Sequence, residues 1–68
     1  MHKETYLKKL GAHIASLRIS KGISQAKFAH SCDKDPRSLN RLEKGRINPS
    51  IIYLKEIAAE LKRVERFA

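Results

Sequence analysis

The chain has 68 residues and a formal net charge of +8, from 15 lysine and arginine residues against 7 aspartate and glutamate residues. This length predicts a single domain over residues 1–68 with little room for a catalytic pocket. The sequence contains no nucleophile–base pair and no phosphate-binding loop, so we do not expect an enzyme. One cysteine excludes an internal disulfide framework, and with three scattered histidines it predicts no metal site and no cofactor.

The same composition bears on location and partner. No apolar run is long enough to span a membrane, and the N-terminus lacks the apolar core of a signal peptide. We therefore expect a cytoplasmic protein with no membrane partner. The excess of positive charge favours a polyanion as partner, while a basic surface that is simply solvated is the alternative.

The first predicted helix begins at about Thr5. Apolar residues recur there at steps of three and four, at Leu7, Leu10, Ile14 and Leu17. This spacing predicts an amphipathic helix with one buried stripe. Lys21 followed by Gly22 is typical of a helix C-terminus, so we expect the helix to end at this glycine.

Residues 24–45 predict two short helices joined by a tight turn. Ser24 is suited to cap the first helix, and Asp33 is one of the few residue types that tolerate a left-handed turn. Asp35-Pro36 predicts the start of the second helix, because a capping carboxylate precedes a proline at the first helical position. The second helix is expected to stop at Gly45. Two helices joined in this way form a helix-turn-helix.

A further helix is predicted after Pro49-Ser50. Its apolar stripe is Leu54, Ile57, Ala58 and Leu61. Residues 62–68 leave two alternatives open. The helix continues, with Val64 and Ala68 extending the stripe, or a separate fifth helix bends back and places Phe67 in the core. In either case the fold class is all-α, with four to five helices.

The pattern around the two short helices resembles the DNA-binding domain of the phage repressor and Cro family, also called the XRE or Cro/CI type. The residues that carry the resemblance are Leu17-Arg18, Gly22, Ser24-Gln25, Phe28-Ala29, Asp35, Leu39, Leu42-Glu43, Gly45 and Asn48-Pro49-Ser50. It covers roughly residues 10–61 and implies a compact lambda-repressor-like domain with a central helix-turn-helix. Two residues depart from the family pattern: Asp33 stands where glycine is usual, and Lys34 where an apolar residue is usual.

The helix expected over residues 35–44 carries residue types that read DNA bases. Arginine pairs with guanine through two hydrogen bonds, and asparagine pairs with adenine in the same way. We predict base contacts in the order Arg37, Arg41, then Asn40 and Ser38. The alternative for Arg41 and Asn40 is that they reach only a phosphate.

Phosphate contacts are predicted on both sides of this helix. The resemblance implies that Gln25 contacts a phosphate, and its amide can also brace the recognition helix. Lys27 adds a further phosphate contact. The loop that follows the recognition helix is expected to run along the DNA backbone, with Lys44, Arg46 and Asn48 as its contacts.

The resemblance also implies an ion pair between Arg18 and Glu43, which would fix the helix-turn-helix against the first helix. The alternative is that Arg18 is a solvated surface residue.

Together these features predict a sequence-specific regulator of transcription that binds double-stranded DNA. We expect a homodimer on a roughly palindromic operator and no small-molecule ligand. The alternative is a protein-interaction module or an antitoxin-type partner protein, which keeps the fold while DNA binding is secondary.

Overall fold

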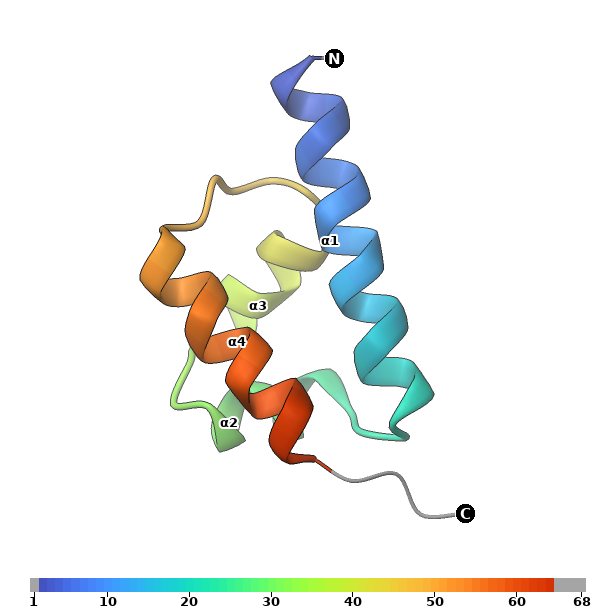
Figure 1. Ribbon diagram of the computed structural model, residues 1–68, viewed down its shortest axis with the longest axis vertical. Helices are drawn as coiled ribbons and strands as arrows, with labels where there is room; N and C mark the ends of the chain where they lie inside the picture. The colour runs from blue at the N-terminus through green and yellow to red at the C-terminus, as the bar shows by residue number, and fades with distance from the viewer. Residues whose placement is uncertain (1, 65–68) are drawn as a thin grey trace.

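Four helices make up the part of the chain that the computed structural model describes, residues 2–64 (Figure 1). They are α1 (Lys3–Ser20), α2 (Gln25–Ser31), α3 (Pro36–Glu43) and α4 (Ile51–Arg63). The described residues contain no strand, which confirms the all-α prediction. Helix α1 begins two residues before the predicted Thr5 and ends two residues before the predicted Gly22.

Side-chain caps set the starts of the three shorter helices. The Ser24 hydroxyl accepts a hydrogen bond from the Lys27 backbone N–H at 3.1 Å, and Ser50 does the same for Tyr53 at 3.0 Å. The Asp35 carboxylate accepts from the Arg37 backbone N–H at 2.8 Å. Each cap satisfies an N–H that has no partner inside its helix. The left-handed turn predicted at Asp33 is confirmed, since its φ is 59°.

The core draws on all four helices. Its buried residues are Ile14, Phe28, Ala29, Leu39, Leu42, Ile57 and Leu61. In Figure 1, α3 lies behind α4 and beside α1, and α2 lies below α3. Burial of these side chains is the main driving force for folding.

Two residues expected in the core, Leu17 and Ala58, are exposed instead. They line a shallow apolar groove of about 250 Å³ between α1 and α4. The prediction was wrong there because the two helices do not close over each other along this groove.

None of the described helices has both the length and the apolar character that a membrane crossing requires.

Glycine allows α1 to approach the end of α3 closely. Gly11 is buried, and a Cβ at this position would overlap the backbone carbonyl oxygens of Leu42 and Glu43. Gly45 has a φ of 72°, and a Cβ there would lie 2.6 Å from the Lys8 Cα. Both positions need a residue without a side chain. The C-terminal end of α3 is therefore held against α1 by backbone contacts.

Helix α4 does not continue through Val64. This residue is extended, with φ −76° and ψ 115°, and its carbonyl oxygen accepts a hydrogen bond from Lys21 Nζ at 3.2 Å. The alternative of an unbroken helix is therefore wrong at this residue, whose carbonyl is bound outside the helix. The predicted fifth helix, with Phe67 and Ala68, lies outside the described residues.

Candidate nucleic-acid interface

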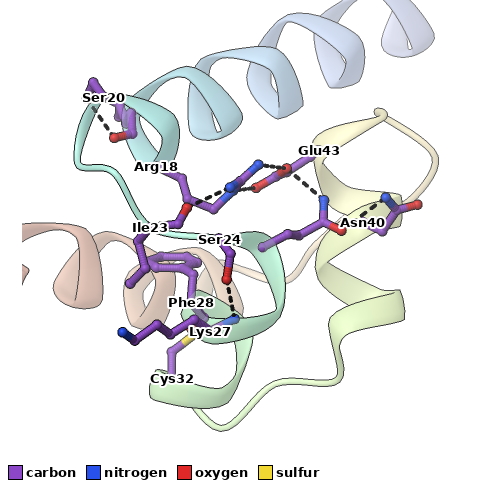
Figure 2. Close-up of polar contacts among 11 residues, drawn as sticks. Arg18, Ser20, Ile23, Ser24, Lys27, Phe28, Cys32, Asn40 and Glu43 are labelled. Atoms are coloured by element: carbon purple, nitrogen blue, oxygen red, sulfur yellow. Dashed lines mark hydrogen bonds and ion pairs between the residues drawn. The ribbon is translucent and has the colours of Figure 1, made fainter.

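An ion pair behind α3 joins its last residue to α1. Arg18 Nε lies 2.8 Å from Glu43 Oε2, and Arg18 Nη2 donates to Glu43 Oε1 at 3.1 Å (Figure 2). Arg18 Nη1 also donates to the Ile23 carbonyl at 2.8 Å. The two charged side chains are only 12% and 6% exposed. The ion pair implied by the resemblance is therefore present, and Arg18 is not a solvated surface residue.

Gln25 connects α2 to α3 through both ends of its amide. Its Nε2 donates to Glu43 Oε1 at 2.9 Å, and its Oε1 accepts from Asn40 Nδ2 at 3.2 Å. This is the bracing role expected as its second function. Asn40 is half-buried, and one of its two amide hydrogens is directed to Gln25 rather than outward. Its carbonyl oxygen and second amide hydrogen remain for a base.

Ser38 faces α4 and does not share the outward face of α3. Its hydroxyl lies 3.1 Å from the Tyr53 hydroxyl, and the residue is half-buried. The Tyr53 ring also contacts Lys34. The Lys34 ammonium lies 4.8 Å from the centroid of this ring and donates a hydrogen bond to Glu56 Oε1 at 2.5 Å. Lys34 thus packs its stem at the usual apolar position of the turn and pairs its charge with α4. Sequence reasoning missed Tyr53 and Glu56, because only the packing of α4 brings them to this turn.

The outward face of α3 borders a shallow depression of about 390 Å³. Its lining residues are Gln25, Pro36, Arg37, Asn40, Arg41 and Arg46. Arg37, Arg41 and Arg46 are exposed, and no carboxylate is among the lining residues. Three arginine residues therefore border one concave surface, whose positive charge attracts an anionic ligand.

The remaining predicted phosphate contacts are not among the residues that line this depression. Lys27 lies on α2, Lys44 caps the end of α3, and Asn48 lies in the loop that follows; all three are exposed. Within residues 2–64, neither lysine forms an ion pair, and Arg41 and Arg46 form none either. Their charges are available to a ligand.

Arg37 differs from these residues because it is paired with Asp35. Arg37 Nη2 lies 3.2 Å from Asp35 Oδ2, and Nε lies 3.4 Å from Oδ1. Hydrogen bonds from the Arg37 backbone N–H and guanidinium hold the pKa of Asp35 below its usual value. The carboxylate in turn raises the pKa of Arg37. Sequence reasoning gave Asp35 only a capping role, although the Asp-x-Arg spacing at a helix start could have signalled this pair.

The other chemically active side chains have structural roles. Among the described residues, no three His, Cys, Asp or Glu side chains gather as metal ligands do. Cys32 is half-buried, and its thiol donates to the Phe28 carbonyl with 3.2 Å between sulfur and oxygen. Burial raises the pKa of this thiol, so it is a packing residue rather than a nucleophile.

Comparison with known families agrees with this geometry. The model of the helix-turn-helix family HTH_3 matches residues 14–66, more than half of the chain. The matched region includes α2 and α3, the Arg18–Glu43 pair and every residue that lines the depression. A search of curated proteins found no match.

Proposed function

Because the chain belongs to the helix-turn-helix family HTH_3, the XRE or Cro/CI type of DNA-binding domain, we propose that it is a sequence-specific transcription regulator. It binds double-stranded DNA as a homodimer on a roughly palindromic operator, and α3 enters the major groove. The major groove is about 12 Å wide and admits an α-helix. Contacts to base edges in this groove supply the sequence specificity, and contacts to phosphates supply most of the affinity.

The depression bordered by Arg37 and Arg41 carries this proposal. The two side chains lie four residues apart on the exposed face of α3, while the opposite face is buried through Leu39 and Leu42. Arginine at such a position reads guanine through its O6 and N7 atoms. Arg37 and Arg41 are therefore the first candidates for base contact.

Asn40 and Ser38 follow in the proposed order of base contacts. Each already has a hydrogen bond within the protein, to Gln25 and to Tyr53 respectively. A base contact from Asn40 uses the part of its amide that faces away from Gln25. A base contact from Ser38 requires its hydroxyl to leave Tyr53 or to share it, which places Ser38 last.

The phosphate contacts are assigned to Gln25, Lys27, Lys44, Arg46 and Asn48. The lysines and Arg46 are exposed and lie at both ends of the helix-turn-helix, so they can follow the DNA backbone on either side of α3. Gln25 has one amide hydrogen that is not directed to Glu43, and it lies at the start of α2, where backbone N–H groups favour an anion.

The length of α3 supports the homodimer. Its eight residues span about 12 Å, the rise of about three to four base pairs. A site of this size recurs too often in a genome to specify one promoter. Two copies that place their α3 helices about 34 Å apart, one turn of DNA, read two half-sites of a palindrome.

The proposal is tested by selecting binding sites from a random duplex library and titrating the winning sequence at several salt concentrations. We expect a palindromic winner with half-site centres about one turn apart. About six phosphate contacts per dimer predict a slope of about −5 for the logarithm of affinity against the logarithm of salt concentration. Sedimentation of the complex should show two protein chains per duplex.

Two outcomes would contradict the proposal. Salt-sensitive binding without a winning sequence would mean a nonspecific DNA binder. No binding at low salt, together with a protein that co-purifies with the chain, would favour the protein-interaction module.

A further inference from the structure

We propose that Asp35 is a positioning residue for DNA recognition, which orients the Arg37 guanidinium so that its outer edge selects guanine. This inference rests on the proposed function. It names guanine as the base that Arg37 contacts and Asp35 as the neighbour that makes this contact selective. Asp35 itself makes no base contact in this scheme.

The geometry of the pair carries the inference. The Asp35 carboxylate accepts the Arg37 backbone N–H at 2.8 Å, which ties it to the first turn of α3. The same carboxylate receives Nη2 at 3.2 Å and Nε at 3.4 Å. Both of its oxygens are therefore bound to Arg37. A carboxylate held by the backbone provides a fixed support for the side chain.

The contact uses only one edge of the guanidinium. Arginine presents its N–H groups in a planar fork, and the edge formed by Nε and Nη2 faces Asp35. One Nη1 hydrogen and the second Nη2 hydrogen point together from the other edge. This second edge has the paired donors that match the O6 and N7 acceptors of guanine.

Exposure and location make this edge accessible. The Arg37 side chain is 85% exposed, and it borders the depression together with Arg41. An exposed arginine without a support samples many rotamers, and ordering them on binding reduces affinity. A guanidinium held before DNA arrives loses less freedom, and its orientation penalises bases that lack two acceptors in the major groove. The pairing therefore acts on specificity more than on total affinity.

The contrast with Arg41 supports this assignment. Arg41 borders the same depression but forms no ion pair within the described residues. Within residues 2–64, no ion pair fixes the direction of its guanidinium. Of these two arginines of α3, only Arg37 has a fixed edge.

Asp35→Asn is the test variant. Asparagine caps a helix about as well as aspartate, so the fold is kept while the charge that holds the guanidinium is removed. Asp33→Asn is the matched control, because it removes the same charge two residues away and asparagine tolerates the left-handed backbone at that position. Both variants, with wild type and Arg37→Ala, are carried through site selection and through titration of the winning duplex and its single-base variants.

We expect wild type to prefer guanine at a position where Arg37→Ala shows no preference. Asp35→Asn should lose about tenfold in discrimination at that position alone, while its binding to random duplex rises slightly because a negative charge is removed. Asp33→Asn should show the same slight rise and keep the discrimination. In the Arg37→Ala background, Asp35→Asn should have no further effect at that position. Arg37→Lys, which keeps the charge without the fork, should also lose the guanine preference and keep the salt slope.

Several results would overturn the inference. Asp35→Asn could retain the guanine preference, or it could change all sequences equally, as Asp33→Asn does; the role would then be purely electrostatic. A base other than guanine at the Arg37-dependent position would also overturn it. These results leave the proposed function intact. If wild type itself selects no sequence, the proposed function fails and the inference fails with it.

Discussion

Two of the three arginine–carboxylate pairs within residues 2–64, Arg18–Glu43 and Arg37–Asp35, have the same chemistry and opposite environments. Arg18 and Glu43 are 12% and 6% exposed and join α1 to the end of α3. Arg37 and Asp35 are 85% and 50% exposed and lie at the start of α3. A pair shielded from water is costly to break, because the remaining charge is left without a partner, whereas an exposed pair contributes little to the free energy of unfolding. The first pair therefore holds α3 against α1, and the second leaves one edge of the Arg37 guanidinium free for the DNA contact that we propose.

Breaking the buried pair should have the largest effect. Glu43→Ala leaves the Arg18 guanidinium without its carboxylate and removes a partner of Gln25, so we expect a loss of about 3 kcal/mol in the free energy of unfolding. Urea denaturation measures this loss. The control is Glu56→Ala, which removes the 52%-exposed partner of Lys34 and should cost less than about 1 kcal/mol. Equal losses in the two variants would show that the Arg18–Glu43 pair is not effectively buried.

The contact between α1 and the end of α3 can also be disrupted at Gly11, where the two backbones approach closely. Gly11→Ala places a Cβ against the carbonyl oxygens of Leu42 and Glu43, which forces α1 away from the end of α3. Overpacking of this kind should cost about 2 kcal/mol, even though alanine favours the helix by about 1 kcal/mol. Ser16→Ala, on the exposed face of α1, should leave stability unchanged or slightly raised. A Gly11→Ala protein as stable as wild type would mean that α1 moves freely at this contact.

Removing the exposed arginine should affect DNA binding rather than folding. Arg37→Ala should lower affinity for the operator about tenfold or more and relax specificity at one base pair, while the urea midpoint changes little. Lys44→Ala is the comparison, because loss of a phosphate contact weakens operator and random duplex alike and makes the salt slope less negative by about one. Equal losses on both duplexes for both variants would refute the assignment of Arg37 to a base.

The smallest effect should be a dependence of stability on pH through Asp35. Its pKa is lowered in the folded chain, so the unfolded chain binds the proton more readily. The stability that this carboxylate contributes is then complete above the ordinary aspartate pKa, near 4, and is lost as pH falls through the folded value. The difference in free energy of unfolding between wild type and Asp35→Asn should therefore shrink between pH 6 and pH 3. A difference that stays constant over this range would mean that the hydrogen bonds from the Arg37 backbone N–H and guanidinium to this carboxylate do not stabilise the folded state.

Local signals explain why much of the fold was predictable. Ser24, Asp35-Pro36 and Gly45 act through their own backbone or the next turn of helix, so the limits of α2 and α3 were close to those expected. The Arg18–Glu43 pair spans 25 residues, and only the family resemblance suggested it.

What the sequence did not reveal depends on how helices meet. Ser38 was predicted to contact a base, as Arg37 was, and only the position of α4 shows that its hydroxyl lies next to that of Tyr53. The sequence gives no sign that Gly11 must lack a side chain, because the requirement comes from the close approach of α3. The end of α4 before Val64 likewise involves Lys21, which lies 43 residues away in the chain.

The backbone contacts at Gly11 and Gly45 have a mechanical consequence. They hold α3 at its C-terminal end, whereas Arg37, the first candidate for base contact, lies in its first turn. Main-chain atoms form this contact between α1 and the end of α3. A contact made by side chains would loosen with each change of rotamer. In the proposed complex, the tilt of α3 in the groove would depend on α1, so residues that never touch DNA would help to decide which base pairs α3 reaches.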